Sequence, residues 1–217
     1  MPKRSTTNRK DGAETYLRIL TAAGKLFAEQ GFASTTNKAV AQHAQVDLAS
    51  INYHFGNRSG LIQATLKAAH SHFIDIEELR AIALSGQHAE QQFEQLINML
   101  VEKIMSGEGW QAQLLSRELL SPSDNIHALL NEESLPKFEI IRKIISGVVG
   151  IEHDNPSLLP CVVSVMAPCL MMVVIDKNAL NPVQQMWQLP EEDVKHYLYT
   201  YALAGLQAVR GSFFQSH

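Results

Sequence analysis

A short predicted helix over residues 48–55 carries side chains whose chemistry suits the edges of nucleic-acid bases. The hydroxyl group of Ser50 can hydrogen-bond to a base, and Leu48 and Ala49 can touch a thymine methyl group. The helix contains no Arg, Lys or Gln, so it lacks the strong bidentate contact that reads guanine. We therefore expect sequence preference to depend on methyl contacts, on Ser50 and on DNA shape; the alternative is a solvated helix face.

Residues on either side of this helix suit the phosphate backbone of DNA. Thr36 and Lys38 lie at the predicted start of the preceding helix, where a hydroxyl, an ammonium and free backbone N–H groups favour a phosphate. Arg58 opens the following helix and offers a bidentate fork. Two of these residues also have a structural alternative, an N-cap for Thr36 and an ordinary surface charge for Arg58.

A helix-turn-helix is the element that would position these side chains, and the pattern predicts one. Apolar periodicity indicates helices over residues 13–30, 36–43, 47–55 and 58–84. Gly31 is expected to end the first helix, and Asp47 to cap the third. If Val40, Val46, Ile51 and Phe55 face the first helix, the side chains left free are Leu48, Ala49, Ser50, Asn52, Tyr53 and His54.

A set of residues in one register extends this pattern: Arg18-Ile-Leu-Thr-Ala-Ala, Leu26-Phe27, Gly31-Phe32, Thr35-Thr36, Val40-Ala41, Ala44, Val46, Tyr53-His54-Phe55 and Leu61. Together they resemble the signature of the tetracycline-repressor (TetR) family of transcriptional regulators. The resemblance implies that Tyr53 and His54 contact DNA, with packing against the first helix as the alternative. Two positions depart from the family pattern. Gln45 stands where glycine is usual, and Arg58 replaces a lysine.

The charge distribution favours a polyanionic partner for the N-terminal third alone. The 217-residue chain has a net charge of −4, but residues 1–67 carry nine Lys/Arg against four Asp/Glu. Residues 68–217 carry nine against eighteen. A flexible basic arm over residues 1–12, with Lys3, Arg4, Arg9 and Lys10, either adds phosphate or minor-groove contacts or is a solvated tail.

The family resemblance implies that the helices beyond residue 85 form a ligand-binding and dimerisation bundle. The run Ser116-Arg-Glu-Leu-Leu-Ser-Pro-Ser123 is similar to a TetR subgroup with an Arg-Glu pair followed by Pro. Arg117 and Glu118 either orient a polar ligand or pair on the surface. Candidate pocket residues, each with ordinary core packing as the alternative, are Met99, Met105, Trp110, Leu114, Arg117, Phe138, Met166 and Met171.

Helices near 158–179 and 191–214 are the expected homodimer interface, since the family pairs its last two helices about a twofold axis. The run 158–175 is apolar around its circumference, and Pro168 inside it should kink the helix. We interpret it as a buried or interface helix rather than a membrane span, because it is short and contains two prolines. Cys161 and Cys169 are too far apart on a helix for a disulfide, which favours a cytoplasmic protein.

The sequence thus predicts an all-α chain of about nine helices. It would comprise the basic arm, a helix-turn-helix domain over residues 13–60 and a ligand-binding and dimerisation domain over 61–217. The expected function is repression of a palindromic double-stranded DNA operator, relieved by a small apolar or amphipathic effector. An activator, a ligand-enhanced binder and a protein-interaction regulator remain alternatives. No nucleophile elbow, phosphate loop or His-Glu-x-x-His pair is present, so we expect no enzyme activity, cofactor or metal.

Overall fold

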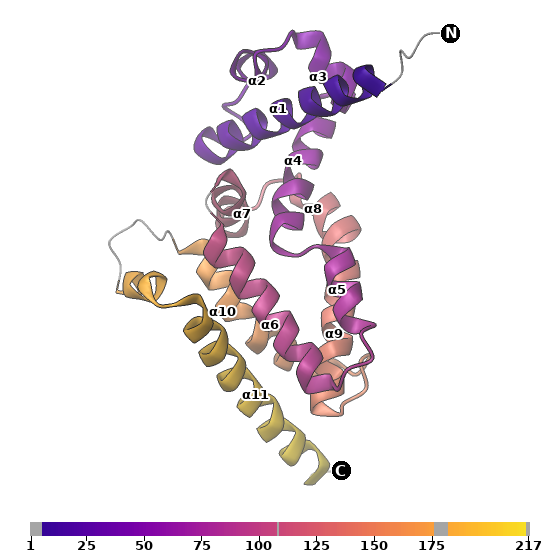
Figure 1. Ribbon diagram of the computed structural model, residues 1–217, viewed down its shortest axis with the longest axis vertical. Helices are drawn as coiled ribbons and strands as arrows, with labels where there is room; N and C mark the ends of the chain where they lie inside the picture. The colour runs from indigo at the N-terminus through magenta and orange to yellow at the C-terminus, as the bar shows by residue number, and fades with distance from the viewer. Residues whose placement is uncertain (1–5, 108, 176–181, 216–217) are drawn as a thin grey trace. The chain divides into compact units, whose positions relative to one another are not determined.

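The computed structural model describes residues 6–107, 109–175 and 182–215, and these are helical without any strand (Figure 1). This confirms the predicted all-α class. The described residues divide into two compact units. The first runs up to His70 and includes the segment that ends at Leu130. The second runs from Ser71 to Gly107 and from Asn131 onward.

The first unit contains α1 (Thr6–Gln30), α2 (Asn37–Ala44), α3 (Leu48–Phe55), most of α4 (Arg58–Phe73), α7 (Trp110–Leu120) and α8 (Ile126–Leu129). Its core forms where the apolar stripe of α1 meets α2, α3 and α4. Ile19, Phe27, Val40, Ile51 and Leu61 are all fully buried there. The α2–α3 pair is therefore fixed to α1 by the burial of one continuous apolar surface.

The turn between α2 and α3 is set by local signals. The Thr36 hydroxyl caps α2 by accepting from the Ala39 N–H at 3.1 Å. Gln45 ends that helix in the left-handed region, with φ 54° and ψ 48°. The guanidinium of Arg18 on α1 donates to the Gln45 carbonyl at 3.1 Å. Gln45 thus adopts the positive φ that favours glycine, and Arg18 hydrogen-bonds to the carbonyl of this turn.

Gly24 in α1 and Gly31 directly after it lie against large side chains from α7. A Cβ atom on Gly24 would overlap the indole ring of Trp110, and one on Gly31 would overlap the guanidinium of Arg117. Gly24 and Gly31 are seven residues apart, and so are Trp110 and Arg117; on a helix this spacing is about two turns. Helices α1 and α7 consequently pack closely, and Figure 1 shows α7 near the C-terminal end of α1.

The second unit contains α5 (Ile76–Ala83), α6 (Ala89–Ser106), α9 (Leu135–Val149), α10 (Leu159–Val174) and α11 (Glu191–Gln215). Shorter segments are a π-helical turn at Leu130–Ser134 and 3-10 turns at Pro156–Leu158 and Gln184–Gln188. Helix α6 packs against all of the other four α-helices and supplies a fully apolar inner face. Lys137 on α9 is also buried, with its Nζ 3.3 Å from Ser71 Oγ and 3.8 Å from a Glu133 carboxylate oxygen.

Two predicted helix boundaries were wrong. Helix α1 begins at Thr6 rather than at residue 13, since Gly12 lowers helix stability by about 1 kcal/mol without stopping the helix. The expected helix over 58–84 is broken after Phe73. Asp75 caps a new helix by accepting from the N–H groups of Glu77 and Glu78 at 2.9 and 3.1 Å.

Candidate nucleic-acid interface

Helix α3 separates into a buried side and an exposed side. Ile51 is fully buried, whereas Tyr53 is 84% and Leu48 50% exposed. Ala49 and Asn52 are also exposed, and Ser50 and His54 are half-buried. The side chains predicted to face away from α1 therefore do so, with His54 as the exception described below.

Ser50 is tied to the start of α3 by Asp47. One carboxylate oxygen of Asp47 accepts from the Ser50 backbone N–H and from the Ser50 hydroxyl, both at 2.7 Å. These two hydrogen bonds lower the pKa of the exposed Asp47 carboxyl below its usual value. The carboxyl group is therefore ionised at neutral pH, and it fixes the direction in which the Ser50 hydroxyl points its proton.

The aromatic residues at the end of α3 have two different environments. His54 packs edge-on to the Tyr16 ring of α1 at 6.1 Å, and Phe55 stacks on the same ring at 4.7 Å. His54 therefore packs against the first helix, while its contact with DNA stays a prediction. Tyr53 meets the His54 ring edge-on at 5.0 Å and projects its own ring into solvent.

The basic side chains around α3 differ in exposure and in their hydrogen-bond partners. Lys38 is exposed in the first turn of α2, beside the N–H groups that suit an anion. The guanidinium of Arg58 donates to the Phe32 carbonyl and, at 3.3 Å, to Asn37 Oδ1. Arg58 thus holds the α1–α2 loop, and its contact with phosphate stays a prediction. Sequence reasoning missed Arg18, an exposed cation at the α2–α3 turn, because its position depends on how α1 crosses α2.

The structure does not gather the predicted effector residues into one place. Trp110, Leu114 and Arg117 belong to α7 in the first unit, where Trp110 and Leu114 join its core. The remaining five lie on three mutually packed helices of the second unit: Met99 and Met105 on α6, Phe138 on α9, and Met166 and Met171 on α10. Met99 is buried, Met105, Phe138 and Met166 are half-buried, and Met171 is 52% exposed.

Glu118 is buried and has an intramolecular role. Its carboxylate accepts from the Ser123 N–H at 3.2 Å and from the Ser123 hydroxyl at 2.7 Å. These bonds close the loop that follows α7. The sequence-level alternatives for this residue were a ligand contact and a surface ion pair, and the structure shows a loop cap instead.

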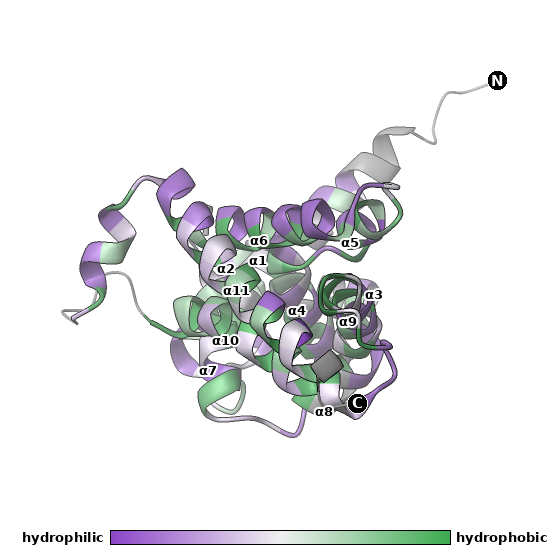
Figure 2. Cartoon of the chain, turned by 90° about the horizontal axis from the view of Figure 1, so that it is seen from below, coloured by the Kyte–Doolittle hydropathy of each residue, from purple (hydrophilic) through white to green (hydrophobic). Residues whose placement is uncertain are grey.

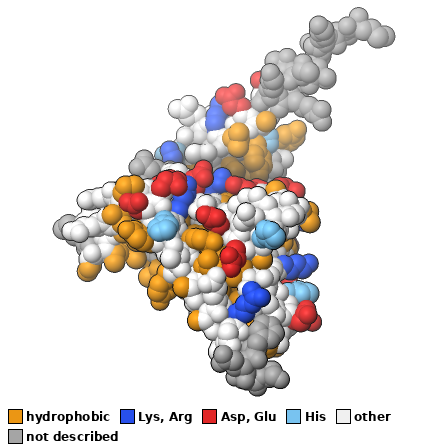
Figure 3. All heavy atoms as spheres, turned by 60° about the horizontal axis from the view of Figure 1, so that its bottom comes forward, with side chains coloured by type: hydrophobic (Ala, Val, Ile, Leu, Met, Phe, Trp, Pro, Cys, Tyr) orange, Lys and Arg blue, Asp and Glu red, His pale blue; other side chains and the backbone are white. Residues whose placement is uncertain are grey.

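An open apolar groove of about 450 Å³ lies between α10 and α11. Its lining includes Cys161 and Ser164 from α10 and Tyr201, Ala204 and Gly205 from α11. Among its lining residues, Tyr201 is 81% and Val209 36% exposed. The ribbon of α10 is coloured as hydrophobic over most of its length in Figure 2, and hydrophobic side chains reach the surface on the face seen in Figure 3.

The same apolar helix passes a length and composition test for a membrane span. Residues Pro156–Val174 have a mean hydropathy of 2.2, and 33% of the tested window is buried. Pro168 lies inside α10, and the helix continues to Val174. The C-terminal end of the predicted interface helix, residues 176–179, lies outside the described residues.

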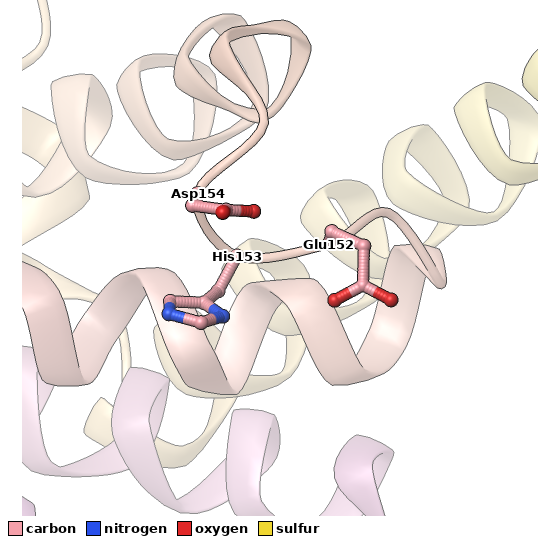
Figure 4. A group of neighbouring side chains, drawn as sticks. All are labelled: Glu152, His153 and Asp154. Carbon is pink, nitrogen blue, oxygen red and sulfur yellow. The ribbon is translucent and has the colours of Figure 1, made fainter.

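Among the described residues, one group of side chains has a composition that could hold a metal ion, and it consists of three consecutive loop residues. Glu152, His153 and Asp154 each offer a ligand atom, and these atoms lie within 4.8 Å of one another (Figure 4). The two carboxylates are exposed on the loop between α9 and α10. Such clusters are common on solvated acidic loops, so this one supports no assignment.

Two family models match the chain in succession. The model described as "Bacterial regulatory proteins, tetR family" matches residues 19–65, the segment that holds α2, α3 and part of α1. The model described as "HTH-type transcriptional dual regulator CecR, C-terminal domain" matches residues 89–209, which is more than half of the chain.

Curated relatives match the N-terminal part. The probable HTH-type transcriptional regulator YttP of Bacillus subtilis is 29% identical over 37% of this chain and 39% of its own length. The HTH-type transcriptional regulator TtgR of Pseudomonas putida is 36% identical over 29% of this chain and 30% of its own length. The chain therefore spans well under half the length of these relatives.

Solved structures match nearly the whole chain at low identity. The fatty acid degradation regulator FadR from Bacillus halodurans has a TM-score of 0.67 at 15% identity, covering 88% of this chain and 96% of that one. A TetR-like regulator from Rhodococcus sp. RHA1 has a TM-score of 0.60 at 12% identity, covering 89% and 96%. These likenesses show the fold. Taken with the two family matches and the exposed, capped helix α3, they establish that the chain is a transcriptional regulator of the TetR family, with a C-terminal domain of the CecR type.

Proposed function

We propose that this regulator binds operator DNA through α3 and represses transcription until a small effector releases it. The observation that carries the proposal is the division of α3 into a fully buried Ile51 and an exposed face with Leu48, Asn52 and Tyr53. A recognition helix needs this division, because one side must hold the helix rigid while the other enters the major groove.

A homodimer formed through α10 and α11 completes the DNA-binding surface. The groove between these helices, with the exposed side chain of Tyr201 in its lining, offers an apolar surface that a second copy can cover. Two recognition helices related by a twofold axis, about 34–36 Å apart, then fit successive major grooves of a palindromic operator. With α10 covered in this way, we expect a cytoplasmic protein rather than one that crosses a membrane.

The effector site is proposed to lie in the second unit, between α6, α9 and α10. Met99, Met105, Phe138 and Met166 come from these three packed helices, and methionine side chains adapt to irregular apolar ligands. Effector and operator would then oppose one another through a coupling free energy of about 1–3 kcal/mol. Helix α4 is the proposed connection, because it begins in the first unit and ends in the second.

Activation at some promoters is the second candidate function. The matching C-terminal family model carries the description of a dual regulator. In this second proposal the same protein–DNA contacts repress from one operator position and activate from another. A reporter assay with the operator placed upstream of, and then within, a promoter distinguishes the two.

Fluorescence anisotropy tests the DNA-binding proposal directly. The probes are a fragment from upstream of the protein's own gene and an unrelated fragment, at two salt concentrations. We expect selective binding that weakens steeply with salt, because bound phosphates release counterions. Lys38→Ala should reduce the salt slope by about one unit. Lys143→Ala, an exposed lysine of the second unit, is the matched control and should leave it unchanged. Equal slopes for both variants would refute the proposed phosphate contact.

A further inference from the structure

The start of α3 contains a carboxylate and a hydroxyl locked together. Asp47 is the N-cap, and one of its oxygens lies 2.7 Å from both the backbone nitrogen and the hydroxyl oxygen of Ser50. Ser50 lies beside the exposed Leu48 and Ala49 in the first turn of the helix. This turn is the part of a recognition helix that approaches base edges.

The hydrogen bond between the two side chains has only one possible direction. An ionised carboxylate accepts hydrogen bonds and has no proton to donate, so the Ser50 hydroxyl must be the donor. The hydroxyl proton is then used within the protein. The lone pairs on Ser50 Oγ remain, and they can only accept a hydrogen bond from a partner.

We infer that Asp47 fixes Ser50 as a hydrogen-bond acceptor, so that Ser50 reads an exocyclic amino group of adenine or cytosine in the major groove. This inference rests on the proposed DNA-binding function. Adenine N6 and cytosine N4 are the major-groove donors, whereas guanine and thymine present only acceptors there. On the strand that Ser50 faces, adenine or cytosine is therefore accepted, and guanine or thymine would meet an unpaired lone pair.

The charge of Asp47 reinforces this preference. Helix α3 has no Lys or Arg to neutralise the carboxylate, and Arg18, the cation identified at this turn, is bonded to the Gln45 carbonyl. A negative charge next to the base edge disfavours the O6 and N7 atoms of guanine and the O4 atom of thymine, which carry partial negative charge. Asp47 is thus a positioning residue, which acts on base choice by orienting Ser50.

Selection from a random 20-bp duplex pool, followed by measurement of the four bases at each enriched position, tests the inference. The wild-type protein should prefer adenine or cytosine at one position per half-site by about tenfold. Ser50→Ala should flatten that position alone. Asp47→Gly, which an N-cap position tolerates at small cost, removes the acceptor, so the Ser50 hydroxyl can turn its proton outward and guanine or thymine gains affinity.

Asp75→Gly is the matched control. Asp75 caps α5 through the same type of carboxylate contact, in a helix other than α3, so its substitution should leave base preference unchanged. An unchanged preference in Ser50→Ala would overturn the inference while leaving operator binding intact. A Ser50-dependent preference for guanine or thymine would overturn the proposed hydrogen-bond direction. Failure of the wild-type protein to enrich any sequence would overturn the proposed function and this inference together.

Discussion

Gly24→Ala examines the close packing of α1 against α7. The added methyl group would overlap the Trp110 indole, and overpacking of this kind costs about 1–3 kcal/mol. Replacing a glycine inside a helix with alanine returns about 1 kcal/mol of helix stability. We therefore expect a net loss of about 0–2 kcal/mol in the free energy of unfolding. In a Trp110→Ala background the overlap is gone, and the same change should stabilise the protein by about 1 kcal/mol.

Urea unfolding followed by circular dichroism at a fixed protomer concentration measures all four members of this double-mutant cycle. The coupling free energy between the two sites should be about 1–3 kcal/mol. Gly12→Ala is the matched control, since it lies in the same helix with open space around it and should stabilise both backgrounds alike. Equal effects of Gly24→Ala with and without the indole ring would refute the argument that Trp110 fills the space over this glycine.

Three further changes test other parts of the structure. Gln45→Gly should raise thermal stability by about 1 kcal/mol because it relieves a positive φ, and a lower melting temperature would contradict this. Tyr201→Asp should convert the proposed dimer to monomers in light scattering, whereas Leu84→Asp, on a similarly exposed residue outside the groove, should leave it dimeric. Burial raises the pKa of the Cys169 thiol to about 11, so iodoacetamide at pH 8 should label this residue only after unfolding; rapid native labelling, read by mass spectrometry, would show that the thiol is accessible.

The helix-turn-helix was predictable because its signals are local. Thr36 and Asp47 cap their helices through contacts three residues away, and this spacing is visible in the sequence. The same reasoning overlooked Asp75, whose capping signal was hidden within a longer apolar periodicity. The hydrogen bond that fixes Ser50 also has a short-range signal, an Asp three residues before a Ser at a helix start.

The predicted effector residues could not be sorted by local pattern, because their neighbours come from distant segments. Trp110 and Leu114 have the size and polarity of pocket residues, yet they pack into the first unit with α1. Arg117 lies over Gly31 because α7 as a whole packs into the first unit. Which apolar side chains come into contact depends on the unit with which each segment packs. That choice depends on contacts between residues far apart in the sequence.

The docking of α7 on α1 limits how regulators of this kind can be recombined. The first family match ends at residue 65 and the second begins at residue 89. The interval between them suggests a junction at which the domains of two regulators could be joined into a chimeric biosensor. Helix α7 lies beyond that junction in sequence but folds with α1. A chimera joined there would set the α1 of one parent against the α7 of another. Such hybrids should assemble only when the parents share small residues at 24 and 31 opposite large ones at 110 and 117.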